Sequence, residues 1–228
     1  MDEIKTPDNA VNFMMASLLK NVRPDDEVEA AEELQREKAR ADHLDDVLKC
    51  GIGSKFNDAD FSNYEAKEYE TIKTVRELIK YAENPGRKTA FLLGNVGLGK
   101  THLGVAILKT CRRSPAYVSM REACIELAVS RSFKADKNTK EVLDGYSRSG
   151  MLVIDEIGRG SDTSDEKLFL SYVMNKRYEN NRPTVLITNL AYDAVKTLLG
   201  ADIIDRILET GKSFTLTGES YRATHKDV

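Results

Sequence analysis

A glycine-rich segment that ends in lysine and threonine is the feature of this sequence that points most directly to chemistry. Residues 94–101 are Gly-Asn-Val-Gly-Leu-Gly-Lys-Thr, which fits the P-loop pattern GxxxxGK[ST]. The glycines let backbone N–H groups approach phosphates closely, and the start of the following helix adds favourable partial charge. Lys100 would reach the β- and γ-phosphates, and Thr101 would bind Mg²⁺. We therefore predict a site for ATP and Mg²⁺ that is formed by Gly94, Asn95, Val96, Gly97, Leu98, Gly99, Lys100, Thr101 and His102.

Two acidic residues follow a second apolar stretch, at residues 151–156. Asp155, at the carboxyl end of a buried strand, can hold the water shell of Mg²⁺ beside Thr101. Glu156 is then placed to orient or deprotonate the attacking water. Strands often end in solvated acids, but this pair follows the P-loop by about 55 residues, with one strand between. The combination predicts a hydrolytic site.

Three further polar residues are candidates for the same chemistry. Asn189 follows the apolar stretch 184–188 and could hydrogen-bond the γ-phosphate or the water. Arg206 lies on an expected helix between the last two strands, and Arg222 lies near the end of the sequence. Each arginine is either an ordinary surface residue or a ligand of phosphate: Arg206 as an arginine finger for a neighbouring subunit, and Arg222 as a second sensor. Spacing alone leaves these alternatives open.

The elements that must position these residues alternate between strands and helices. Strand-like stretches occur at residues 89–93, 116–120, 151–154, 184–188 and 213–217. Helical stretches occur at residues 66–83, 101–113, 121–131, 165–180 and 193–200. Continuous apolar strands alternating with helices indicate an α/β fold with a parallel sheet covered on both faces. We expect five parallel strands.

The first fifty residues have a different pattern. A helix is expected at residues 8–22, and a second, highly charged one at residues 25–49. Gly51 and Gly53 then mark a hinge, so we divide the chain into residues 1–50 and 51–228. The helical extension either folds onto its own domain or docks onto another protein.

The charge distribution limits the classes of partner. The net charge is −3, with ten acids and four bases in residues 25–50 but eight bases and five acids in residues 112–148. This excludes a uniformly basic DNA-binding domain and leaves room for a local basic surface. A groove that follows phosphates and stacks bases needs basic and aromatic residues together. The candidates are Phe133, Lys134, Lys137 and Tyr146, although a solvated basic face explains them equally well.

Composition also bears on the compartment. No apolar run approaches the roughly 18–20 residues that a membrane-spanning helix needs, so no membrane partner is expected. The three cysteines, Cys50, Cys111 and Cys124, are odd in number and form no CxxC pair. They favour neither a disulfide framework nor a zinc site, and we expect a cytoplasmic protein.

Taken together, these motifs resemble those of AAA+ ATPases of the DnaC/IstB branch. The resemblance covers about residues 50–224 and rests on residues 51–56, 61–64, 94–101, 154–158, 177–178, 182–183, 187–190, 205–206 and 220–222. The Phe-x-Asn-Tyr element at 61–64 and the Ser-Tyr-Arg element at 220–222 favour the DnaC-type replicative helicase loaders over IstB. Because the sequence ends six residues after Arg222, we expect a reduced or absent lid domain.

This resemblance implies a function and roles for several residues. It implies an ATPase stimulated by single-stranded DNA, which loads a hexameric DnaB-family helicase and self-associates into a hexamer or open spiral. Residues 1–50 would bind the helicase. The resemblance makes Arg206 the arginine finger and Arg222 the second sensor, and places Phe61, Asn63 and Tyr64 near the adenine.

Three alternatives remain open. An IstB-like partner of a transposase would act on duplex DNA, and an ATP-binding adaptor would show little turnover. A small-molecule kinase is disfavoured, because no lid or acceptor-binding segment is apparent in the sequence.

Overall fold

The computed structural model describes residues 24–160 and 163–221, and divides into two compact units, residues 1–42 and 43–228. The helix expected at residues 8–22 and the candidate sensor Arg222 lie outside the described residues.

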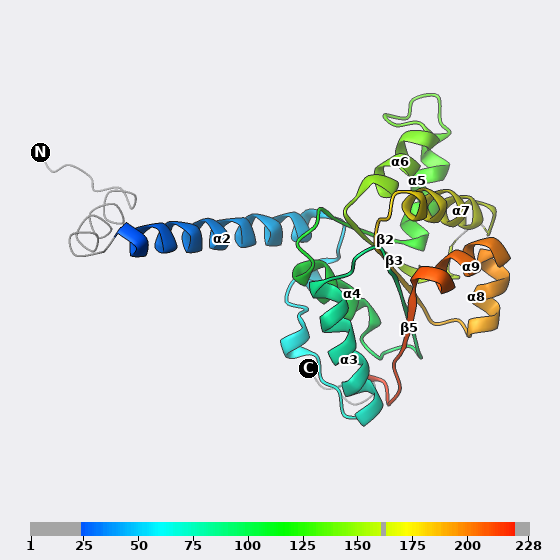
Figure 1. Ribbon diagram of the computed structural model, residues 1–228. Helices are drawn as coiled ribbons and strands as arrows, with labels where there is room; N and C mark the ends of the chain where they lie inside the picture. The colour runs from blue at the N-terminus through cyan, green and yellow to red at the C-terminus, as the bar shows by residue number, and fades with distance from the viewer. Residues whose placement is uncertain (1–23, 161–162, 222–228) are drawn as a thin grey trace, which may run out of the picture. The chain divides into compact units, whose positions relative to one another are not determined.

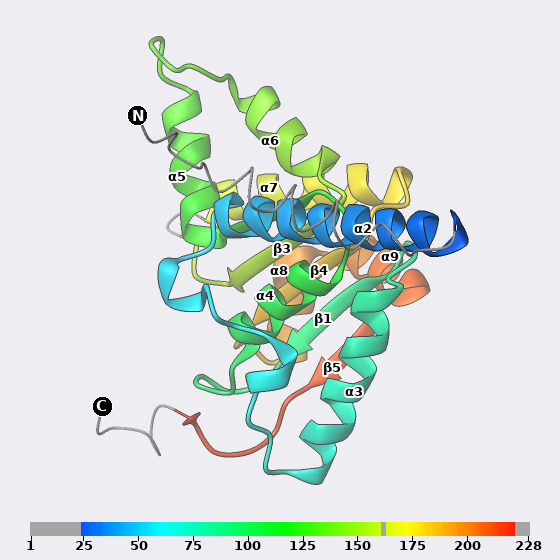
Figure 2. The same cartoon turned by 90° about the vertical axis from the view of Figure 1, so that its left-hand side faces the viewer.

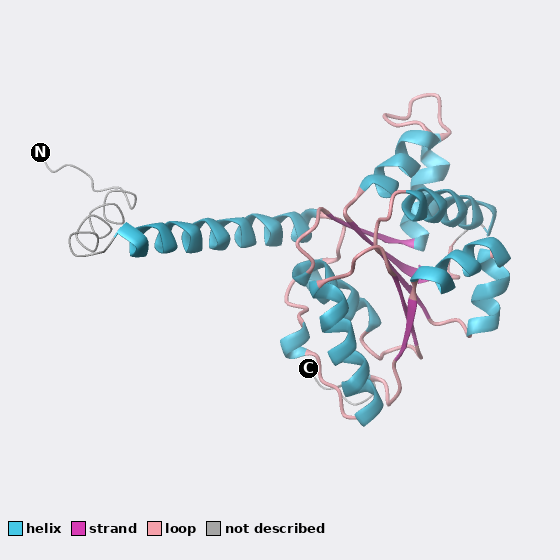
Figure 3. Cartoon of the chain, in the orientation of Figure 1, coloured by secondary structure: helices cyan, strands magenta, loops and turns pink. Residues whose placement is uncertain are grey.

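The larger unit is built on a sheet of five parallel strands, as predicted (Figures 1 and 3). The strands lie in the order β2-β3-β4-β1-β5. Their bounds are β1 Thr89–Leu93, β2 Pro115–Ser119, β3 Met151–Ile157, β4 Thr184–Thr188 and β5 Lys212–Thr215. The P-loop strand β1 lies between β4 and β5, and all five residues of β4 are buried. Continuous apolar strands are buried here because both faces of the sheet are covered.

Helices cover the two faces as separate layers. The layer with α3 (Tyr69–Glu83) and α4 (Lys100–Thr110) shares one apolar cluster with the sheet, and Figure 2 looks onto this face. Five helices pack on the opposite face around a second apolar cluster. They are α5 Met120–Ser130, α6 Thr139–Arg148, α7 Thr163–Glu179, α8 Tyr192–Leu199 and α9 Ala201–Thr210. Two short 3₁₀ turns, η2 (Ser54–Phe56) and η3 (Phe61–Asn63), precede α3.

The charged helix α2 (Pro24–Lys49) is close to the expected one, but the larger unit begins within it, at His43 rather than at residue 51. Val47 is fully buried in the apolar cluster with α3 and α4, and the ring of His43 lies 2.9 Å from the carbonyl oxygen of Leu108. Residues 28–42 are all exposed. The last turns of α2 are therefore part of the core of the larger unit.

The segment after β5 crosses the P-loop. The Leu216 N–H donates to the Leu93 carbonyl at 2.9 Å, and the Tyr221 N–H donates to the Gly97 carbonyl at 3.0 Å. The described residues between β5 and Tyr221 form no lid helix. Nor does any helix in the described ranges combine the length and the apolar character that a membrane crossing requires.

Candidate nucleotide-binding site

The P-loop connects the end of β1 to the start of α4 and is tightly enclosed. Gly97 and Gly99 have φ angles of 86° and 72°, in the left-handed region that favours glycine. A Cβ atom at Gly97 would lie 1.9 Å from the Ser220 hydroxyl, and one at Gly99 would lie 2.6 Å from the Tyr64 ring. Both glycines are therefore required by conformation and by space. The loop is held between the segment before α3 and the segment after β5.

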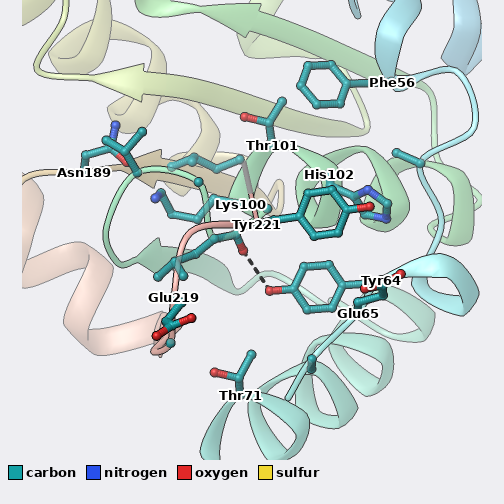
Figure 4. A pocket seen from close by; sticks show the side chains of 18 of the residues that line it. Phe56, Tyr64, Glu65, Thr71, Lys100, Thr101, His102, Asn189, Glu219 and Tyr221 are labelled. Atoms are coloured by element: carbon teal, nitrogen blue, oxygen red, sulfur yellow. Dashed lines mark hydrogen bonds between the residues drawn. The ribbon is translucent and has the colours of Figure 1, made fainter. Parts of the chain in front are cut away.

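A cavity of about 580 Å³ opens beside this loop, within the size range of small-molecule sites (Figure 4). It brings together most of the residues that the sequence predicted for the site. Its lining includes Asn63, Tyr64, Val96, Gly97, Leu98, Gly99, Lys100, Thr101, His102, Asp155, Glu156 and Asn189. The predicted residues Gly94, Asn95 and Phe61 are not part of this lining. The lining also contains residues that the motifs did not indicate, among them Phe56, Glu65, Thr71, Arg159, Glu219 and Tyr221.

Lys100 is a buried cation at the wall of this cavity. Its side chain donates to the carbonyls of Gly94 and Asn95 at 2.7 and 2.6 Å. Burial lowers its pKa, because the charged form loses hydration. Both acceptors belong to the P-loop itself, so the ammonium group is hydrogen-bonded to the loop that precedes it in the sequence.

The Asp155 carboxylate is held by hydroxyl groups from two elements. Thr101 Oγ1 donates to Asp155 Oδ2 at 2.6 Å, and the Tyr117 hydroxyl donates to the same oxygen at 2.9 Å. Asp155 is only 3% exposed. Burial, together with the nearby Asp155 charge, raises the pKa of Tyr117, which keeps its hydroxyl a donor at neutral pH. Adjacent hydroxyl and carboxylate oxygens are hard ligands, so Thr101 and Asp155 fit Mg²⁺.

Glu156 and Asn189 reach the cavity from the neighbouring strands β3 and β4. The register of these strands shifts between Ile154 and Ile157, and Glu156 adopts a φ of 57°, which is unusual for a residue other than glycine. Such irregularities re-aim side chains at the end of a strand. Glu156 lies 3.8 Å from the guanidinium of Arg159, in an exposed ion pair.

The 3₁₀ turn before α3 is attached to the P-loop and its helix. The Tyr64 hydroxyl donates to the Leu98 carbonyl at 2.7 Å, and burial raises the pKa of this tyrosine to about 12. His102 Nε2 lies 2.8 Å from the carbonyl oxygen of Asp60. The Tyr64 and His102 rings are 5.6 Å apart and line the cavity together.

The neighbours Asn63 and Phe61 have mainly structural contacts. Asn63 accepts from the Asp60 N–H at 2.9 Å and donates to the Asp58 carbonyl at 2.7 Å. Phe61 packs against the apolar cluster beneath α3 and α4. Of the three aromatic and amide residues predicted near the adenine, Tyr64 is the one whose ring contacts the P-loop.

Arg206 lies at the other end of the sheet. Its guanidinium donates to Asn175 Oδ1 at 2.6 Å and lies 5.2 Å from the centre of the Tyr178 ring. It borders Thr89 and Thr184, which begin β1 and β4. It does not line the P-loop cavity of its own chain, so any contact with ATP would have to come from another copy.

The predicted DNA-contact residues fall into two environments. Phe133, Lys134 and Lys137 lie exposed in the connection between α5 and α6, and Phe133 is exposed in full. Tyr146 has a different environment: its ring packs 5.3 Å from that of Phe169, and its hydroxyl donates to Glu126. Tyr146 is half-buried and packs against the edge of the apolar cluster that contains Phe169, and its contact with DNA stays a prediction.

Comparison with known proteins identifies the family. Residues 21–228 match the family described as IstB-like ATP binding protein. The chain belongs to this IstB/DnaC family.

Individual relatives agree with this assignment. The replicative helicase loader DnaC of Buchnera aphidicola subsp. Baizongia pistaciae (strain Bp) is 30% identical over 183 residues, which cover 76% of this chain and 73% of that protein. The replicative helicase loader DnaC of Escherichia coli (strain K12) is 28% identical over 181 residues, 77% of this chain and 74% of that protein. A solved structure of the DnaC helicase loader superposes with a TM-score of 0.64 at 20% identity, over 72% of this chain and 100% of that one.

These matches confirm the predicted fold class of this IstB/DnaC chain, an AAA+ α/β domain with a five-stranded parallel sheet. Some of the missed lining residues carried a signal in the sequence. Phe56 ends a stretch that already resembled the family, and Tyr221 is the tyrosine of the Ser-Tyr-Arg element. Arg159 carried none, and neither did Tyr117, which lies outside the lining but bonds Asp155, because the positions of both depend on how β3 pairs with its neighbours.

Proposed function

We infer that this IstB/DnaC-family ATPase loads a hexameric DnaB-family replicative helicase onto single-stranded DNA and hydrolyses ATP at the interfaces between its own subunits. One observation carries the inference. A P-loop cavity completed by Asp155, Glu156 and Asn189 lies in a chain that matches helicase loaders over about three quarters of its length. The named activity of those relatives supports the same activity here.

The geometry supports a division of labour within one subunit. Bound phosphates would replace the carbonyls of Gly94 and Asn95 as partners of Lys100, because an anion is the stronger acceptor for a buried ammonium. Thr101 and Asp155 would hold Mg²⁺, which neutralises phosphate charge when bound.

Two further residues would act on the reacting groups. Glu156 would orient the attacking water and take its proton, and Asn189 would hydrogen-bond the γ-phosphate or that water. Tyr64 and His102 would contact the base.

A second subunit would complete this site. Arg206 lies away from the cavity of its own chain, which supports a role as the arginine finger of a neighbour in a hexamer or open spiral. Such a finger stabilises the charge that develops during phosphoryl transfer. Arg222, outside the described residues, stays a prediction as the second sensor.

The partner surfaces are proposed from exposure and charge. Phe133, Lys134 and Lys137 form an exposed basic loop with one aromatic ring, which supports contact with single-stranded DNA. Residues 28–42 expose Val28 and Leu34 on a charged helix, which supports helicase docking by the N-terminal region.

A loading experiment tests the proposal. The full chain, the cognate DnaB-type helicase, circular single-stranded DNA, ATP and Mg²⁺ are mixed, and the helicase that remains on the circle after gel filtration is measured. We expect the full chain to increase this amount strongly, and Lys100→Ala to abolish the increase, whereas Lys73→Ala, at an exposed position on α3, retains it.

Two variants of the chain test where the DNA and the helicase bind. A Lys134→Ala/Lys137→Ala variant should bind the helicase but load it poorly, with a defect that is largest at low salt, because the lost phosphate contacts are the ones that salt weakens in the unmodified chain. A chain lacking residues 1–42 should fail to bind the helicase, and it spares the buried Val47 that a cut at residue 50 would remove. If the full chain leaves helicase loading unchanged, the loader function is wrong.

The name of the family itself favours one second candidate, an ATPase partner of a transposase. That function predicts ATP-dependent binding to duplex DNA and no effect on the helicase. The same mixture made with duplex circles distinguishes the two. An ATP-binding adaptor, the third alternative, would load without measurable turnover of ATP.

A further inference from the structure

We propose that Tyr117 is a positioning residue of the nucleotide site, which fixes the Asp155 carboxylate in the orientation that MgATP requires. Tyr117 is outside the lining of the cavity, so it acts through Asp155 and not on the nucleotide. The proposal rests on the function inferred above, in which Asp155 serves the bound Mg²⁺.

The register of β2 and β3 explains how Tyr117 reaches Asp155. Tyr117 pairs with Val153, and Ser119 pairs with Asp155. Because side chains alternate along a strand, Tyr117, Ser119 and Asp155 face the same side of the sheet. Tyr117 is thus the diagonal neighbour of Asp155, a distance that a long aromatic side chain spans and a short one does not.

Ser119, the direct cross-strand neighbour of Asp155, uses its hydroxyl to bond Glu122 instead. The Ser119 hydroxyl donates to Glu122 Oε2 at 2.7 Å and accepts from the Glu122 N–H at 3.2 Å, as the N-cap of α5. The side-chain donors that the structure gives to Asp155 are therefore Thr101, at 2.6 Å, and Tyr117, at 2.9 Å. A buried carboxylate depends on such donors for its orientation.

The backbone of Tyr117 is also fixed from outside the sheet. Its N–H donates to the Cys50 carbonyl at 3.1 Å, and a Cβ atom on Gly51 would lie 2.7 Å from its carbonyl oxygen. The residues that follow α2 therefore rest on the outer edge of β2, at the residue whose side chain holds Asp155. The main chain of Tyr117 is thus held in place, and its hydroxyl is directed at Asp155, as a positioning residue requires.

The test measures nucleotide binding instead of turnover. A fluorescent, non-hydrolysable ATP analogue is titrated into the full chain with Mg²⁺ and again with a chelator. For Tyr117→Phe we expect the Mg²⁺-dependent gain in affinity to fall on the order of tenfold, as for outer partners of metal ligands in general, with unchanged affinity in chelator. Tyr81→Phe is the matched control, since it removes another buried tyrosine hydroxyl, bonded to the Lys88 carbonyl away from the cavity.

A second pair of variants separates positioning from general stability. In an Asp155→Asn background, Tyr117→Phe should cause no further loss, because the two residues act as one unit. An undiminished Mg²⁺ effect in Tyr117→Phe, or equal losses with and without Mg²⁺, overturns the proposal and leaves the ATPase function intact. If instead the unmodified chain gains no affinity from Mg²⁺, the metal assignment of Thr101 and Asp155 fails, and this proposal fails with it.

Discussion

The two ends of the sheet each bury a cation, and they satisfy it in different ways. At the amino end, Arg177 is fully buried and donates to Thr184 Oγ1 at 2.8 Å and to the carbonyls of Ser149 and Pro183 at 2.8 and 2.5 Å. At the carboxyl end, Lys100 donates to carbonyls of its own loop and borders a cavity.

The difference distinguishes a structural cation from one that can change partners. Arg177 joins α7 to β4 and to the connection before β3, so its acceptors are fixed by the packing of three segments. The acceptors of Lys100 lie five and six residues before it, on a loop that a ligand can reach. Burial lowers the pKa of both groups, so burial alone does not separate the two roles.

The largest expected effect concerns Arg206. It lies at the amino end of the sheet, but we propose that it contacts the ATP bound at the carboxyl end of the sheet in a neighbouring subunit. Arg206→Ala should reduce ATP turnover by about 10³-fold or more, the usual effect of removing an arginine finger, with the fold retained. Steady-state ATPase assays measure this at a protein concentration that supports self-association.

Mixing two inactive variants makes this test specific. Glu156→Gln keeps Arg206 but lacks the residue that orients the water, so a mixed assembly with Arg206→Ala contains some complete interfaces. We expect the mixture to regain part of the activity. No recovery, in assemblies shown by light scattering to be mixed, would falsify the role of Arg206 in trans.

The next effect is on stability, and it tests whether Arg177 is structural. Arg177→Lys keeps the charge but loses the planar fork that reaches several acceptors at once, so buried carbonyls stay unpaired. We expect a loss of about 3–5 kcal/mol in the free energy of unfolding, measured with urea. Lys100→Ala should change that free energy by less than about 1 kcal/mol while abolishing nucleotide binding. Equal stability losses in the two variants would erase the distinction between the two cations.

The smallest effects come from two buried threonines on β4, one at each end of the sheet. Thr184 accepts from Arg177, whereas Thr188 donates to the Ile157 carbonyl at 2.7 Å and accepts from the Leu190 N–H. Replacing either with valine should cost about 1–3 kcal/mol, since a buried polar partner is left unpaired. Only Thr188→Val should also slow turnover at saturating ATP, because the Thr188 hydroxyl fixes the end of β4, which Asn189 directly follows. A turnover defect in Thr184→Val would contradict this division.

Local features of this site could be predicted from the sequence. The P-loop and the acids after β3 are contiguous motifs, and parallel strands bring their carboxyl ends to one edge. The five strands and most of the helices between them followed from apolar runs and turn residues, with bounds that agree to within a few residues, but α6 was not among the expected helices. These features depend on residues that are close together in the sequence, so they can be predicted from one sequence alone.

Features that depend on register and packing could not be predicted. Tyr117 meets Asp155 only through the pairing of β2 with β3, and the Tyr146 ring packs against Phe169 only because α6 lies beside α7. The contacts that His43 and Val47 make with the larger unit were equally hidden, because both residues lie within an otherwise charged helix.

The position of Tyr221 has a practical optical consequence. Its ring lines the nucleotide cavity, its N–H is bonded to the P-loop, and the whole sequence contains no tryptophan. A tryptophan introduced by Tyr221→Trp would therefore be the sole indole in the molecule, set beside the site where a nucleotide is proposed to bind. Its fluorescence would report arrival and departure of the ligand in real time, without any label on the nucleotide.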